Sequence, residues 1–247
     1  MSVAAPSLAR ENLKDSHEEH PLRAAAVRRC GSAGGRGFST IELLVGATLS
    51  LIALAVLYSV FSMQQKVVAA QNTSAETQAA TRNAIDLLSR ELRMATYDPT
   101  GAALPLAPGP SCPGVRRGLD EAGPTKIRFR QDLNGDGALA SPGEDLTYEV
   151  IGNELTRTDG AGARQTVAAG IPAGGVSFQY FNGNNPPAEL LPGGSPAALS
   201  PGQRDCVAKV RVTVRVSLPN PDPANSVPVR SSAASEVAIR NRSLANF

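Results

Sequence analysis

The chain has 247 residues, of which 42% are hydrophobic, and this is enough for one large globular domain or two small ones. Beyond residue 37 it carries 18 basic and 18 acidic residues, a balance that gives no indication of a nucleic-acid-binding surface or an acidic substrate. Both histidines, His17 and His20, lie before residue 38, so the rest of the chain cannot build a Ser-His-Asp triad, a Cys-His pair or a histidine-ligated metal site.

An apolar run without charge or proline covers residues 43–61. As a helix rising about 1.5 Å per residue it would span about 28 Å, close to the thickness of a bilayer core. Arg28, Arg29 and Arg36 lie just upstream, and basic residues stay on the cytoplasmic side of a membrane. No small-residue cleavage site follows the run. The sequence therefore predicts a single-pass anchor with its N-terminus in the cytoplasm and the rest of the chain outside.

One acid, Glu42, stands at the start of this run, and a carboxylate in hydrocarbon costs several kcal/mol. The surrounding segment "RGFSTIELLVG" resembles the type IV prepilin signal: a basic leader ends in glycine, phenylalanine follows, and glutamate is the fifth residue after the glycine. The resemblance implies cleavage after Gly37 by prepilin peptidase on the cytoplasmic face and N-methylation of the new Phe38. Residues 1–37 would be the leader and 38–63 the transmembrane half of a longer helix.

The same resemblance gives Glu42 a role in assembly. Cleavage would create an ammonium group at Phe38, and the carboxylate of a neighbouring subunit could pair with it inside the bilayer. Two buried charges that neutralise each other cost far less than either charge alone. The alternative is a simple anchor in which Glu42 lies among the lipid headgroups.

Helix is expected to continue from the anchor through residues 64–97, which contain no proline or glycine, until "YDPTG" ends it. Its last turns are amphipathic, and Asp86 and Arg90 are spaced to form an i,i+4 ion pair. The apolar positions that recur at helical spacing, and would face the rest of the domain, are Ile85, Leu88, Leu92 and Ala95.

The remainder, residues 98–247, is expected to be a β-rich head. Alternating apolar and polar residues predict strands at "TKIRFRQ", "LTYEV", "VSFQY", "CVAKVRVTVRVSL" and, briefly, "SEVAIRN". Gly152 and Asn153 form a two-residue hairpin signal. The fold class is α+β: one apolar face per strand predicts an antiparallel β-sheet packed on the amphipathic half of the long helix, as in a pilin fold. Long Pro- and Gly-rich loops are expected at 98–124 and 182–205.

Three cysteines are present, and Cys30 lies in the N-terminal stretch. The remaining pair, Cys112 and Cys206, reads as a disulfide in a chain exported past a membrane. Such a bridge would tie both long loops to the sheet. The alternative is two buried free thiols.

An acidic turn, "DLNGDGALASPGED", has the oxygen-bearing residues Asp132, Asn134 and Asp136 at alternating positions. They match the first half of a calcium loop, in which such residues bind a hard cation. The bidentate acid belongs at the twelfth position, which is Gly143, so Glu144 would have to replace it one residue late. The alternative is a tight Asp- and Gly-rich turn between two strands.

The function that these features predict is structural. "RNAIDLLSRELRMATY", the acidic turn and its following strands, and "EVAIRNR" resemble stretches of PilW-type minor pilins and pseudopilin J. The resemblance implies a minor pilin of the inner membrane, with a periplasmic head, that initiates or caps a filament. Its partners would be prepilin peptidase, the other minor pilins, the major pilin and the inner-membrane assembly platform, with no direct nucleic-acid binding.

Three alternatives remain. The chain could be pseudopilin J of type II secretion, with pseudopilins as partners. It could deliver a calcium-dependent adhesive or ligand-binding head on a pilin helix. An enzyme is not expected, because only a Ser-Lys dyad that uses Lys66, Lys126 or Lys209 could be assembled, and nothing in the sequence marks one.

Overall fold

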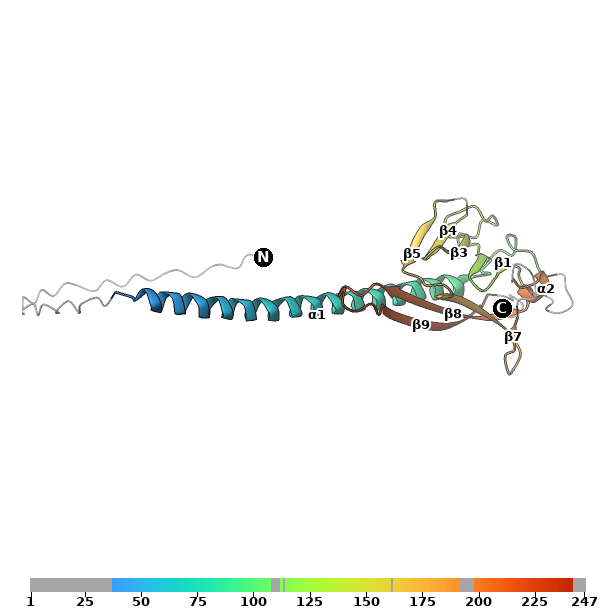
Figure 1. Cartoon of the computed structure of the whole chain (residues 1–247). Coiled ribbons are helices and arrows are strands. Elements are labelled where there is room, and N and C mark those ends of the chain that lie inside the picture. Colours follow the sequence, from blue (N-terminus) through green and yellow to red (C-terminus); the bar gives the residue numbers. More distant parts are fainter. Residues whose placement is uncertain (1–36, 108–111, 113, 161, 192–197, 242–247) are drawn as a thin grey trace, which may run out of the picture. The chain divides into compact units, whose positions relative to one another are not determined.

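The protein was examined as a computed structural model, which describes residues 37–107, 112, 114–160, 162–191 and 198–241. It is an α+β protein with one long helix, α1 (Thr40–Met94), and two antiparallel sheets (Figure 1). The chain forms two compact units, 1–53 and 54–247. In the described part of the first unit, residues 37–39 precede the opening turns of α1. The second unit holds the rest of α1 and all of the strands.

The C-terminal half of α1 carries the predicted apolar stripe, since Ile85, Leu88 and Leu92 are buried, and Ala95 is buried just beyond the helix. The helix ends three residues before the predicted Tyr97. Thr96, at a φ of 65°, turns the chain away, and its amide N–H donates to the Arg130 carbonyl. The ion pair predicted between Asp86 and Arg90 does not form.

The first sheet has five strands in the order β1-β2-β3-β4-β5. They are β1 (Leu119–Ala122), β2 (Lys126–Arg130), β3 (Asp145–Ile151), β4 (Glu154–Asp159) and β5 (Gln165–Ala169). Gly152 and Asn153 join β3 to β4 as the predicted two-residue turn, and Gly152 has a φ of +61°, which glycine adopts without strain. The acidic turn is the connection between β2 and β3.

The second sheet has four strands in the order β7-β6-β8-β9. They are β6 (Val176–Asn182), β7 (Glu189–Leu190), β8 (Val207–Leu218) and β9 (Val229–Ala238). A short helix, α2 (Pro201–Asp205), leads directly into β8. The valines of β8 alternate inward as predicted, from Val210 to Val216.

The head differs from the expectation in its loops, its sheets and its last strand. The predicted loops 98–124 and 182–205 contain the short elements β1, β7 and α2. The strands form two sheets, not one, because alternation tells which side of a strand is apolar but not which strands pair. The last strand is also longer than the predicted "SEVAIRN". Its Ser- and Ala-rich first half has weak strand propensity, but β8 pairs with it over ten consecutive residues.

The core lies between α1 and the two sheets, which contact different sides of the helix. Glu91 of α1 bonds to Tyr148 of β3, and Ser89 bonds to Ser235 of β9. The largest buried side chains come from all three layers and include Leu88, Leu92, Phe129, Leu146, Tyr148 and Tyr180. Burial of this apolar surface is what holds the second half of α1 to the head.

Candidate assembly and cation-binding sites

The predicted processing site lies at the N-terminal edge of the described structure. Gly37, Phe38 and Ser39 precede α1, and the Phe38 side chain is 82% exposed. The amide N–H of Leu43 donates to the Ser39 carbonyl and closes the first helical turn. The remainder of the predicted leader, 1–36, lies outside the described residues. Gly37, Phe38 and Ser39 are all exposed, and cleavage between Gly37 and Phe38 stays a prediction.

Glu42 lies in the first turn of α1, and it is exposed. An acid in this turn interacts favourably with the helix dipole, by about 0.3–1 kcal/mol. Its neighbours Ile41, Leu43 and Leu44 are apolar and exposed as well. The carboxylate is thus a single charge among exposed apolar side chains.

The most apolar 18-residue window of α1 has a mean hydropathy of 2.3, and none of it is buried. Among the described residues α1 is the one helix long and apolar enough to cross a membrane. A helix that is apolar on every side and is not covered by protein suits a lipid environment. These properties are compatible with a single-pass membrane protein.

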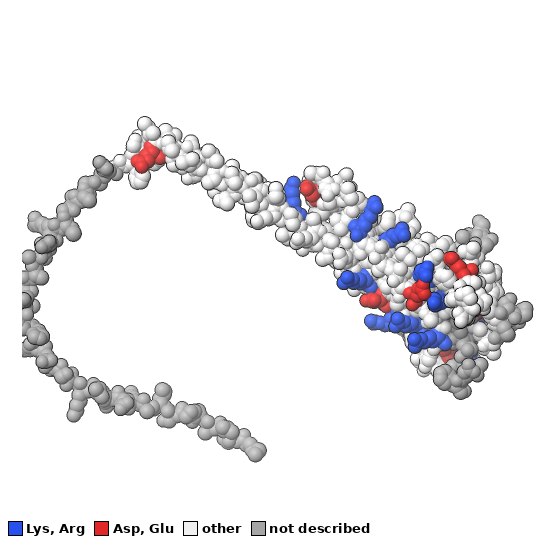
Figure 2. Space-filling view, turned by 90° about the horizontal axis from the view of Figure 1, so that it is seen from below, with Lys and Arg blue, Asp and Glu red and all other residues white. Residues whose placement is uncertain are grey.

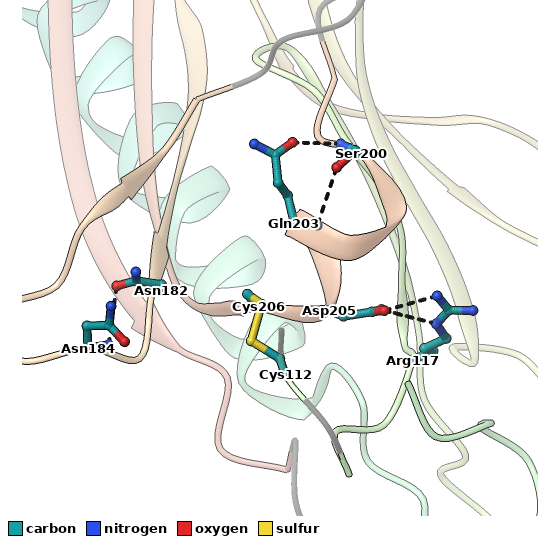
Figure 3. Close-up of a disulfide and its surroundings, with 8 residues drawn as sticks. All are labelled: Cys112, Arg117, Asn182, Asn184, Ser200, Gln203, Asp205 and Cys206. Carbon is teal, nitrogen blue, oxygen red and sulfur yellow. Dashed lines mark hydrogen bonds and ion pairs between the residues drawn. A yellow bond between two sulfur atoms is a disulfide. The ribbon is translucent and has the colours of Figure 1, made fainter. Parts of the chain in front are cut away.

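The cysteine pair predicted to be bridged is bridged: a disulfide joins Cys112 to Cys206, with their Cα atoms 5.4 Å apart (Figure 3). It closes a loop across a sequence separation of 94 residues, and such a link lowers the entropy of the unfolded chain. Cys206 lies directly after α2 and before β8, so the bridge links Cys112 to the start of β8.

Polar contacts also stabilise α2 next to the disulfide. Ser200 and Gln203 form a capping box, in which each side chain accepts the other residue's backbone N–H (Figure 3). At the other end of α2, the Arg117 guanidinium donates to both carboxylate oxygens of Asp205, at 3.1 and 3.0 Å. The disulfide and this ion pair therefore link α2 and the residue after it to Cys112 and Arg117.

The acidic turn folds around its own backbone. The two carboxylate oxygens of Asp132 accept the amide N–H groups of Gly135 (2.7 Å) and Gly137 (3.1 Å). Both glycines have positive φ, at 74° and 79°, which other residues rarely adopt. The Asp132 side chain is buried, so these bonds compensate the loss of water around its charge.

Glu144, at the end of the turn, also accepts hydrogen bonds from backbone amides of the turn. Its carboxylate accepts the amide N–H groups of Ser141 (2.8 Å) and Leu133 (3.3 Å). Between them, the Asn134 amide donates to an Asp136 carboxylate oxygen at 2.8 Å. The four residues predicted to bind calcium are therefore in one loop, but their oxygens accept hydrogen bonds from the loop itself.

No group of three or more His, Cys, Asp or Glu side chains is placed to hold a metal ion in the part of the chain that the structure describes. Calcium also takes amide and backbone carbonyl oxygens as ligands, among its six to eight. The geometry matches the alternative weighed for the sequence, an Asp- and Gly-rich turn between two strands. Calcium binding stays a prediction for titration to test.

The lysines considered for a Ser-Lys dyad are all in ion pairs. The pairs are Lys66 with Asp222 (3.3 Å), Lys126 with Glu121 (3.0 Å) and Lys209 with Glu236 (3.2 Å). Each of these three ammonium groups therefore contacts a carboxylate.

Sequence reasoning missed a polar cluster that links α1 to the first sheet. Tyr148 donates a short hydrogen bond to the Glu91 carboxylate, and the Arg157 Nε donates to the same carboxylate at 3.1 Å. Burial, and then the Glu91 charge, raise the pKa of Tyr148 well above its ordinary value. Glu91 and Arg157 are 66 residues apart, so no local pattern could have identified the pair.

A second missed cluster fixes the segment after α1. Asp98 is buried and accepts the amide N–H groups of Gly101 (2.7 Å) and Leu104 (2.9 Å) and an Arg116 N–H (3.0 Å). Burial alone would raise the pKa of Asp98, but these donors and the Arg116 charge hold it below its ordinary value. "YDPTG" was identified only as a helix stop, and the role of its acid came from the tertiary structure.

The chain matches no protein-family model, no curated protein and no solved structure.

Proposed function

We propose that this protein is a minor pilin of the PilW type, which initiates or caps a type IV pilus together with other minor pilins. The observation that carries the proposal is Glu42, a lone acid in the first turn of α1 at the start of its exposed apolar run, five residues after Gly37. The prepilin-like segment "RGFSTIELLVG" supports the same function.

The mechanism follows from the cost of that charge. Prepilin peptidase would cut after Gly37, leaving an ammonium group on Phe38. In a lone subunit Glu42 would stay without a partner in the membrane. In a filament the Glu42 carboxylate of one subunit would neutralise the Phe38 ammonium of the next, and the removal of two unpaired charges would favour assembly.

The head would then contribute contacts outside the membrane. The pilin fold that the proposal requires is a long helix whose second half packs on antiparallel strands, and the packing of Leu88 and Leu92 against the head is in keeping with it. After assembly the head would lie on the periplasmic side or at the tip of the filament.

The test is to express the tagged full-length chain with prepilin peptidase and the candidate partner subunits, and to sequence the N-terminus of the membrane-extracted protein. A mature chain that begins with N-methylated Phe38 is expected. Retention of residues 1–37 would contradict the proposal. The partners that co-purify, pilus subunits or type II secretion pseudopilins, would identify the machine.

Glu42→Ala tests the pairing itself. Cleavage after Gly37 should persist, because the peptide bond is untouched, while co-purification with partner subunits should fall at least about tenfold, as the loss of one charge pair in the membrane predicts. Glu76→Ala is the matched control, since Glu76 is an exposed acid of the same helix outside the apolar run. Equal co-purification by both variants would show that Glu42 is not the pairing group.

A further inference from the structure

β9 forms one edge of the four-stranded sheet, and the hydrogen-bond pattern shows which of its backbone groups are open. The Ile239 N–H donates to the Ala208 carbonyl, on the β9 side of β8, and the Arg215 N–H donates to the Gly175 carbonyl on the other side. Because bonded pairs alternate along an antiparallel ladder, odd-numbered residues of β9 bond to β8 and even-numbered residues point their N–H and C=O groups outward. The outward-pointing residues are Arg230, Ser232, Ala234, Glu236 and Ala238.

This edge lacks the features that usually prevent strand addition. Edge strands in soluble proteins are commonly short, bulged, interrupted by proline or charged along their length. β9 has ten residues, pairs with β8 without a bulge, and contains no proline. The five residues in its middle, 231–235, are all serine or alanine. An edge whose middle residues are small and uncharged can accept the backbone of an added strand.

A basic helix surface runs beside this edge. The Ser89 hydroxyl lies 3.1 Å from that of Ser235, and the Asn241 side chain donates to the Arg93 carbonyl, so β9 follows the last turns of α1. Arg82 and Arg93 are seven residues before and four residues after Ser89, which places them on the same side of the helix.

We call Arg82, Arg90 and Arg93 the basic row. All three are exposed, and none forms an ion pair with a described residue. Two acids lie between them along the helix: Asp86, and Glu91, whose carboxylate is bonded to Tyr148 and Arg157 of the first sheet. Basic side chains are spread along the face of the protein shown in Figure 2. A strand added to β9 would therefore lie close to unpaired positive charge.

We propose that the β9 edge and the basic row are a docking site for an extended, acidic strand of a partner polypeptide. The partner's backbone would pair with the outward N–H and C=O groups of β9, and its acids would face the guanidinium groups of the basic row. A second copy of β9 is a poor complement, because its only acid, Glu236, is already paired with Lys209 (3.2 Å) and Arg211 (2.9 Å). The inference rests on the head and the second half of α1, and it adds a head contact to the proposed assembly function.

The test uses the full-length protein in detergent and three fluorescent ten-residue peptides. The first alternates threonine and glutamate, the second replaces every glutamate with lysine, and the third is the acidic peptide with alternate backbone nitrogens methylated. The acidic peptide should bind, with an anisotropy signal that weakens as salt is added. The other two should bind at least about tenfold more weakly, since one loses the charge complement and the other the backbone donors.

Two sets of variants locate the binding. Ala234→Pro removes an outward N–H and leaves the bonds to β8 intact, so it should weaken binding about tenfold, whereas Ala234→Val keeps the N–H and should bind normally. The double change Arg82→Glu and Arg93→Glu should weaken binding of the acidic peptide by a similar factor. Arg164→Glu, at an exposed arginine away from β9, is the charge control.

Several results would overturn the proposal. Equal binding of the methylated and unmethylated acidic peptides would exclude strand addition, even if Ala234→Pro proved unstable. Failure of the acidic peptide to bind at millimolar concentration would exclude the site. A concentration-dependent dimer that Ala234→Pro abolishes would make a second copy the occupant. Glu42→Ala should leave peptide binding unchanged, so a failed pairing mechanism in the membrane and a failed docking site give different results.

Discussion

The two halves of α1 are both helical, but the leucines of the first half are exposed, whereas Leu88 and Leu92 of the second half are buried. Leu57, in the apolar run, is 65% exposed, whereas Leu88, thirty-one residues further along the same helix, is 0% exposed. The first half is apolar on all sides and exposed, while the second has one apolar stripe and buries it against two sheets. An apolar stripe is matched by a protein core, and an apolar cylinder needs an apolar solvent. The comparison suggests that the head is stabilised by the second half alone.

The largest expected effect comes from truncating the same residue type in both halves. Leu88→Ala should lower the free energy of unfolding of the head by about 2–5 kcal/mol, through lost burial and a cavity. Leu57→Ala should change it by less than about 0.5 kcal/mol, because its neighbours are not head residues. Urea denaturation in detergent, followed by the fluorescence of the buried tyrosines, measures both. Equal losses would mean that the apolar run also supports the head.

Removing the disulfide should have the next largest effect, and only on the head. The double change Cys112→Ala and Cys206→Ala removes a link between residues that are 94 positions apart in the sequence. It should lower the free energy of unfolding of the head by about 2–4 kcal/mol. The helical circular dichroism that survives head unfolding, which would come from the apolar run in the micelle, should stay the same. Its loss together with the head would show that the two halves of α1 unfold as one.

A pH effect should arise at the point where α1 ends and the head begins. The pKa of Asp98 is held below its ordinary value of 3.8, so the unfolded chain takes up a proton before the folded one does. The stabilisation is therefore present above about pH 4 and is lost as pH falls below it. Asp98→Asn should lower the free energy of unfolding by about 2 kcal/mol at neutral pH. It should also reduce the loss of stability that the wild type shows between neutral and acid pH, the acid limb of its stability curve. An unchanged acid limb would place the sensitive group elsewhere.

Addition of calcium should have the smallest effect on the stability of the head. If the acidic turn binds the ion, millimolar calcium raises the melting temperature of the wild type, and Asp132→Ala abolishes the rise. Asp132→Ala also removes the acceptor for Gly135 and Gly137, so it should lower the melting temperature without calcium. An identical melting temperature of the wild type with calcium and with a chelator would remove the prediction of a cation site.

Local patterns were sufficient for the elements that carry strong periodicity. Val210 to Val216 alternate, and they face the core; Leu88 and Leu92 repeat at helical spacing, and they are buried. The pairing of the strands could not be predicted in the same way, because an alternating strand can pair with any strand of similar length. β9 shows the limit: "VRSSAAS" has little pattern of its own and became a strand because β8 offered it ten backbone partners.

The sequence by itself determined the apolar run with its single acid, the α+β class, the two-residue turn at Gly152 and the choice of Cys112 and Cys206 as a pair. Each is set by neighbours in the chain or by the count of a rare residue type. Only the tertiary structure decided the division into two sheets, the contact of Glu91 with Tyr148 and Arg157, and the open edge of β9 beside the basic row. These depend on which distant segments lie side by side, and that is governed by the packing of the whole core and not by any local pattern.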